Sequence, residues 1–143
     1  MSSNISKYFL PIFAIVFLNG CMPTSFNAMK NDDTIHREKF TINQNYQTLY
    51  KRSLEKSHEC YDIGMITAVI TTDGQLYSDL KEAEVYTYMI GGFGKQFHFG
   101  TTFKYVDNNV TSMTSYMFGG YTEKRIDCMR KIFIGESKNC ECN

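Results

Sequence analysis

The chain has 143 residues, of which 15 are basic and 15 acidic, so its formal net charge at pH 7 is zero. Without a basic stripe or a polybasic run, the sequence argues against nucleic acid as a partner and against purely electrostatic binding to an anionic membrane. Phe and Tyr are abundant and Trp is absent, a composition that favours a half-buried β-sheet.

The first twenty residues have the pattern of a cleaved export signal. Lys7 precedes an apolar run from Tyr8 to Leu18, which is much shorter than the roughly 20 residues that a helix needs to cross a bilayer. A basic start, a short apolar stretch and then small residues are typical of a secretory signal and not of a membrane span. We therefore expect residues 1–20 to be a signal peptide.

The end of this signal carries a more specific motif. The sequence Leu18-Asn19-Gly20-Cys21 resembles the lipobox of bacterial lipoproteins, which signal peptidase II reads. The resemblance implies that Cys21 is lipidated, becomes the first mature residue and anchors the protein to a lipid bilayer. Met22, where an aspartate would favour inner-membrane retention, implies by the same resemblance the periplasmic face of the outer membrane. An ordinary secretory signal, with Cys21 free to pair, is the alternative.

Four further cysteines agree with export, namely Cys60, Cys128, Cys140 and Cys142. An even number of cysteines in an exported chain predicts disulfides, and four of them allow three pairings. A bridge between Cys140 and Cys142 would close a very small, strained ring, so we favour bridges that join the tail to the body. A bridge between Cys60 and Cys128 is the competing arrangement, because both are expected on helices that face the core.

The segment that follows the lipobox predicts first a linker and then a helix. Residues 21–39 are polar, mixed in charge and without sustained periodicity, so we expect a flexible tether. Residues 40–42 are a candidate short strand, and Asn43 or Asn45 offers a helix N-cap. A helix is predicted over residues 45–59. Its apolar positions are Tyr46, Leu49, Tyr50 and Leu54.

The middle of the chain is predicted to be rich in β-strands. Residues 63–71 are apolar on both faces, as expected of a central, covered strand. Asp73-Gly74 is a tight-turn dipeptide that leads into a short strand. Another strand is expected at residues 85–90, and the glycine-rich residues 91–94 should reverse the chain.

The clearest alternation follows this reversal and predicts a strand with one wet side. One face should carry Phe97, Phe99, Phe103 and Tyr105, and the other Gln96, His98, Thr102 and Lys104. After a turn at residues 107–109, residues 110–118 should return as the antiparallel partner. The polar set is the candidate contact face, although plain solvent exposure explains it equally well. The partner strand could add Thr111, Met113, Ser115 and Met117 to this face.

A last helix is expected over residues 121–133, with Cys128 pointing inward, and residues 135–143 read as a polar tail. The order of helix, antiparallel strands and helix predicts an α+β fold. It would contain one antiparallel sheet of about four to five strands, with an N-terminal and a C-terminal helix packed on one face. Residues 40–143 would form this single domain.

The sequence contains no complete catalytic motif of the types considered below. There is no His-Glu-x-x-His pattern and no Gly-x-Ser-x-Gly elbow, and Gly94-Lys95 lacks the other residues of a phosphate loop. Two thiols around Glu141 are a weak metal signal. We therefore expect a non-enzymatic envelope lipoprotein, without cofactor or metal, that has a structural role or docks onto another envelope protein. The alternative is a periplasmic small-ligand or metal-binding module.

Overall fold

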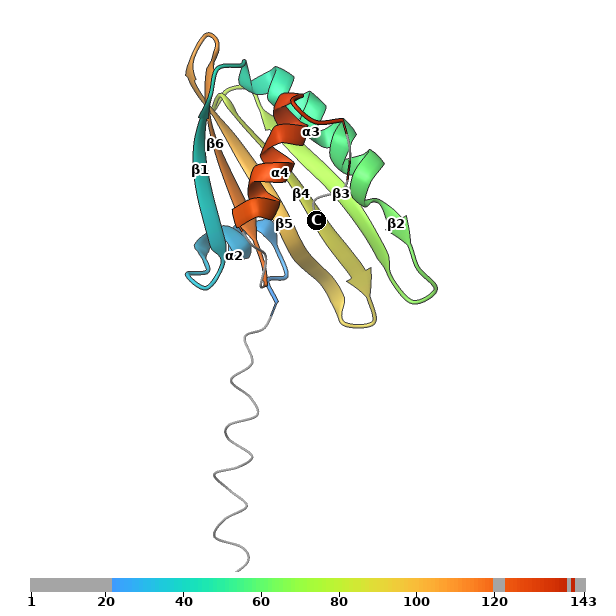
Figure 1. Ribbon diagram of the computed structural model, residues 1–143. Helices are drawn as coiled ribbons and strands as arrows, with labels where there is room; N and C mark the ends of the chain where they lie inside the picture. Colours follow the sequence, from blue (N-terminus) through green and yellow to red (C-terminus); the bar gives the residue numbers. More distant parts are fainter. Residues whose placement is uncertain (1–21, 120–122, 139, 141–143) are drawn as a thin grey trace, which may run out of the picture.

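The computed structural model describes residues 22–119, 123–138 and 140. They form an α+β domain around one six-stranded antiparallel sheet with the strand order β1-β6-β5-β4-β3-β2 (Figure 1). The strands are β1 (His36–Ile42), β2 (Ile63–Gly64), β3 (Val69–Tyr77), β4 (Glu82–Gly91), β5 (Gly94–Asp107) and β6 (Val110–Met117). The helices are α2 (Phe26–Asn31), α3 (Tyr46–Tyr61) and α4 (Glu123–Ile134). The predicted α+β class and antiparallel sheet are confirmed, but the sheet has more strands than the four to five expected.

The helix expected near residues 45–59 is α3. The side chain of Asn45 accepts hydrogen bonds from the backbone N–H groups of Gln47 and Thr48, so Asn45, and not the alternative Asn43, is the N-cap. Tyr46 and Leu49 are buried at the start of the helix. The helix ends at Tyr61, two residues later than expected, and this extension brings a tyrosine to the edge of the core.

The main core lies between α3, α4 and one face of the sheet (Figure 1). Its buried helical side chains are Tyr46, Leu49, Ile126, Met129, Ile132 and Phe133. Its buried strand side chains are Ile42, Ala83, Val85, Phe99, Phe103, Met113 and Met117. The two helices pack together over the middle of the sheet and bury the side chains of this core beneath them.

A smaller core lies on the opposite face, under α2. It contains Phe26, Met29, Ile35, Tyr86, Tyr88 and Phe97. The tether expected over residues 21–39 is therefore wrong for the part that forms α2 and β1. Ser25 is the N-cap of α2. Two apolar side chains of this helix, Phe26 and Met29, are buried, with exposed fractions of 5% and 0%. These two residues are one helical turn apart, which is too few for a visible periodicity. The polar residues around them therefore gave the segment the composition of a linker.

The segment 63–71 is also different from the central strand that was expected. It divides into β2 and β3 at the edge of the sheet, and Ile66 between them is fully exposed. Apolar residues on both faces indicated coverage on both sides, but no described element covers this corner. The prediction that this segment is buried on both faces is therefore wrong.

Gly74 does not form the tight turn that Asp73-Gly74 indicated. Both residues lie inside β3, where Asp73 pairs with Tyr86 and Gly74 with Val85. A Cβ atom at Gly74 would come within 3.0 Å of Tyr50 Cε2, because α3 crosses closely above this point. The glycine therefore permits helix packing, and the chain reverses later, between Tyr77 and Glu82.

Candidate functional site

A β-bulge in β5 decides which way His98 points. Thr87 of β4 pairs with Phe99, whereas the next residue, Tyr88, pairs with Phe97, so His98 is the extra residue. The bulge reverses the alternation of side chains along β5. Phe97 therefore belongs to the smaller core beneath α2, and Phe99 to the main core beneath α3 and α4.

His98 lines a cavity of about 290 Å³ between the end of α3, α4 and the sheet. The apolar part of the wall is formed by Ile63, Ile70, Phe99, Met117 and Met129. Tyr61, Thr87 and Arg125 complete it. A mainly apolar cavity with a few convergent polar groups has the general character of a small-molecule site.

Two polar atoms of this cavity have no partner within the part of the chain that the structure describes. They are Tyr61 Oη and His98 Nε2, and both are buried. A buried polar atom without a hydrogen bond costs about 1–3 kcal/mol. A ligand or a water molecule that bonded both atoms would remove this cost.

Burial acts on the charge state of both residues. It lowers the pKa of His98 below its ordinary value of 6.5 and raises the pKa of Tyr61 above its ordinary value of 10.0, against the opposing effect of Arg125. Near pH 7 the cavity thus offers a neutral imidazole and a protonated phenol. This pair can donate to and accept from an uncharged polar group or a carboxylate, and Arg125 adds a positive charge to the wall.

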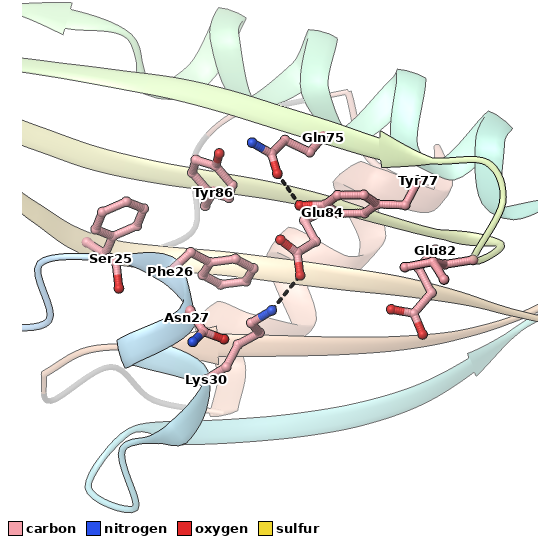
Figure 2. A pocket seen from close by; sticks show the side chains of 11 residues that line it. Ser25, Phe26, Asn27, Lys30, Gln75, Tyr77, Glu82, Glu84 and Tyr86 are labelled. Atoms are coloured by element: carbon pink, nitrogen blue, oxygen red, sulfur yellow. Dashed lines mark hydrogen bonds and ion pairs between the residues drawn. The ribbon is translucent and has the colours of Figure 1, made fainter.

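A second cavity, of about 530 Å³, lies between α2 and the β3–β4 hairpin (Figure 2). Its polar groups largely satisfy one another. Lys30 Nζ donates to Glu84 Oε1 at 2.6 Å, and the Tyr77 hydroxyl donates to Gln75 Oε1. Burial, and to a smaller degree the charge of Asp73, raises the pKa of Tyr86 to about 12. We regard this cleft as the contact between α2 and the sheet, because the charged side chains in its wall, Lys30, Glu82 and Glu84, are already in ion pairs.

The structure corrects the candidate contact face. Gln96 and His98 lie on the α3–α4 side of the sheet, with Gln96 opposite Met89, whereas Thr102 and Lys104 lie on the α2 side. Lys104 Nζ there pairs with Glu82 at 2.8 Å. The bulge at His98 is the physical reason, since it shifts the alternation by one residue. The β6 residues proposed to extend this face, Thr111, Met113, Ser115 and Met117, are buried instead.

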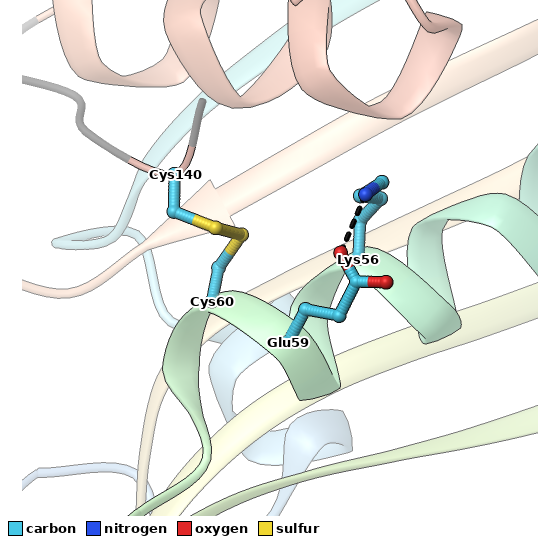
Figure 3. Close-up of a disulfide and its surroundings, with 4 residues drawn as sticks. All are labelled: Lys56, Glu59, Cys60 and Cys140. Carbon is cyan, nitrogen blue, oxygen red and sulfur yellow. Dashed lines mark hydrogen bonds and ion pairs between the residues drawn. A yellow bond between two sulfur atoms is a disulfide. The ribbon is translucent and has the colours of Figure 1, made fainter. Parts of the chain in front are cut away.

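A disulfide joins the end of α3 to the C-terminal tail. Cys60 and Cys140 are linked, with their Cα atoms 5.2 Å apart (Figure 3). The expected disulfide is thus confirmed for this pair, and the competing bridge between Cys60 and Cys128 is excluded. Cys128 is disulfide-bonded as well. Cys21, the predicted lipidation site, and Cys142 lie outside the described residues.

The sequence had pointed to His98 but not to its neighbours in the cavity. Tyr61 lies beyond the end of the helix predicted over residues 45–59, and Arg125 falls within the helix predicted over residues 121–133, where no role was assigned to it. Among the described residues, no group of three His, Cys, Asp or Glu side chains is arranged to hold a metal ion. Within the same residues, no helix is long and apolar enough to cross a membrane. No protein-family model matches the chain, and no curated protein matches it.

Proposed function

We propose that this chain is a lipid-anchored envelope lipoprotein with a non-enzymatic role, structural or docking, at the periplasmic face of the outer membrane. The observation that carries the proposal is the lipobox-like sequence Leu18-Asn19-Gly20-Cys21 directly before the folded domain. Pro23 is already buried, and its carbonyl accepts a hydrogen bond from Phe97 N–H. Acyl chains on Cys21 would therefore hold the domain itself, without a long spacer.

The disulfide supports a location outside the cytoplasm. The bond between Cys60 and Cys140 closes a loop with a sequence separation of 80 residues. Such bonds persist in oxidising compartments such as the bacterial periplasm and are rare in the cytosol. An export signal, a lipid on the first mature residue and a disulfide in the domain are all consistent with a protein of the bacterial envelope.

Metabolic labelling with palmitate tests the anchor. We expect label in the wild-type chain and none in Cys21→Ser, because the acyl chains need that sulfur atom. The double variant Cys60→Ser with Cys140→Ser is the matched control, since it removes cysteines away from the lipobox without leaving an unpaired partner, and it should keep the label. Label that persists in Cys21→Ser would overturn the proposal. Crosslinking in intact cells, followed by identification of the captured protein, tests the docking role.

A second candidate function is the binding of a small ligand in the His98 cavity. The two buried polar atoms without partners, Tyr61 Oη and His98 Nε2, favour it. The chemistry suits a small molecule with an apolar body and one carbonyl, hydroxyl or carboxylate group. Octanoate is a suitable probe in an NMR titration of the His98 ring. We expect saturable shifts in the wild type and weaker binding in Tyr61→Phe, whereas an unmoved His98 signal would refute this function.

A further inference from the structure

The connections between β2 and β3 and between β4 and β5 carry the most exposed large apolar side chains of the described residues. Ile66 is fully exposed in the first, and Phe93 is 94% exposed in the second. Around them lie the half-exposed side chains of Ile63, Met65, Val69 and Ile90. A cluster of exposed apolar side chains of this kind marks a surface that contacts a protein or a membrane.

The two connections form one surface, which we call the apolar corner (Ile63–Val69 and Ile90–Phe93). Met65, Ala68 and Phe93 line the same shallow cleft. A Cβ atom on Gly91 would lie 3.5 Å from the Cβ of Ala68, so the backbones meet closely there. Met65 N–H also donates to the Ala68 carbonyl at 2.8 Å, which holds Ile66 at the tip of a tight turn.

The described chain begins at the same end of the sheet as this corner (Figure 1). The carbonyl of Pro23 bonds to Phe97 N–H, and Phe97 is only three residues, or ~10 Å of strand, beyond Gly94. Cys21 precedes Pro23 by two residues, which is ~7 Å of extended chain. A lipid on Cys21 and the tips of the corner can therefore reach the same plane.

The charges of the corner suit a lipid surface. Residues 63–72 and 85–96 contain no acidic side chain, and their one charged residue is Lys95. Lys95 follows Phe93 by two residues, and its Nζ lies 3.6 Å from the centre of the Tyr88 ring. An ammonium group two residues along the strand from an apolar tip can reach lipid phosphates while the tip enters the acyl region.

The other side of the chain start has a different character. The connection between α2 and β1 carries Asp32 and Asp33, and Arg37 lies 3.9 Å from the carboxylate of Asp33. Carboxylates favour water over the bilayer interface. This asymmetry would make the domain lean towards the apolar corner.

We propose that the apolar corner is a second membrane contact, in which Ile66 and Phe93 insert into the same bilayer that holds acylated Cys21. The corner then fixes the orientation of the domain, with the sheet standing on the membrane at the β4–β5 end. This proposal rests on the lipid anchor proposed above. Interfacial apolar groups of peripheral proteins enter the headgroup and acyl boundary by ~5–10 Å, a depth that exposed loop tips can reach.

Tryptophan fluorescence can test the insertion, because the chain contains no Trp. Phe93→Trp and Ile66→Trp place a reporter at each tip of the corner. Leu80→Trp is the matched control, since Leu80 is also an exposed apolar turn residue, 69% exposed, but stands at the far end of β4. The ten residues of that strand separate Leu80 from Phe93 by ~30 Å.

Each variant is purified as the full chain from bacterial membranes and reconstituted into vesicles of phosphatidylethanolamine and phosphatidylglycerol with brominated acyl chains. We expect blue-shifted emission for Trp at positions 93 and 66, with quenching several-fold stronger than at position 80. Vesicle flotation is measured on the same samples. Floating protein with no quenching at position 93 or 66 would overturn the membrane contact and leave the anchor standing. Protein that does not float would overturn the anchor and, with it, this inference.

Discussion

The carbonyl of Pro23 accepts a hydrogen bond from the N–H of Phe97 at 2.9 Å, and this contact joins the start of the described chain to β5. Phe97 lies directly before the bulge residue His98 and packs with Phe26 of α2 in the smaller core. The same stretch of β5 therefore bonds to the chain start, packs against α2 through Phe97 and lines the cavity through His98.

Gly100 provides the space in which α2 rests on the sheet. A Cβ atom there would lie 2.0 Å from Cε2 of Phe26, whose ring packs at 5.1 Å from that of Tyr86. We expect Gly100→Ala to lower the free energy of unfolding by about 1–3 kcal/mol and to increase hydrogen exchange in α2. Gly64→Ala, also in a strand but with nothing near the new atom, is the control. Equal losses in urea unfolding for both variants would contradict this packing.

The disulfide between Cys60 and Cys140 should contribute substantially to stability. Its loop is long, with a sequence separation of 80 residues, and the loop-entropy relation then gives about 4 kcal/mol. The double variant Cys60→Ser with Cys140→Ser should lose roughly this amount in urea unfolding. Replacing both cysteines avoids an unpaired thiol that could exchange with Cys128. An unchanged unfolding midpoint would show that the tail adds nothing to the folded state.

Tyr86 should make the protein sensitive to alkaline pH. Burial, with a smaller effect of the Asp73 charge, raises its pKa from 10.0 to about 12. A group with a raised pKa in the folded state stabilises the fold fully below its unfolded pKa, and this contribution is lost as pH rises from 10 towards 12. We therefore expect the wild type to lose stability over this interval more steeply than Tyr86→Phe. Urea unfolding at a series of pH values measures the difference, and parallel curves would refute it.

His98 should act in the opposite pH direction. Burial lowers its pKa below 6.5, so the folded state favours the neutral ring. The stabilisation is present above the ordinary pKa and is lost as pH falls below it towards the folded value. We expect the wild type to lose stability on acidification from pH 6.5 more steeply than His98→Gln, which carries no titrating group. NMR titration of the ring should give a midpoint below that of a histidine in an unfolded peptide.

Local patterns in the sequence were sufficient for several elements. Two asparagines, Asn43 and Asn45, marked the region where α3 begins, and Asn45 is its N-cap. The glycines around Phe93 identified the reversal between β4 and β5. The alternation after this reversal indicated a strand correctly. These features depend on the conformational preferences of a few neighbouring residues, which the sequence states directly.

The candidate sites needed the tertiary structure. The bulge separated His98 from Lys104, so the contact face predicted from strict alternation does not exist as one surface. Tyr61 reached the His98 cavity only because α3 continues beyond its predicted end and packs near α4. Neither effect has a local signature, because each depends on how a second element pairs or packs.

The sequence by itself determined the α+β class, the antiparallel pairing and a motif that predicts a lipid on Cys21. The tertiary structure decided which apolar residues are covered. Met29 of α2 is buried against the sheet and Ile66 is exposed to solvent, although both are apolar residues in short segments with many polar neighbours. Whether a side chain is buried depends on which residues lie next to it. The strand order of the sheet brings those residues together from distant parts of the chain. The periodicity of a sequence indicates which residues share one face of a helix or strand, but only the packed structure shows whether another element covers that face.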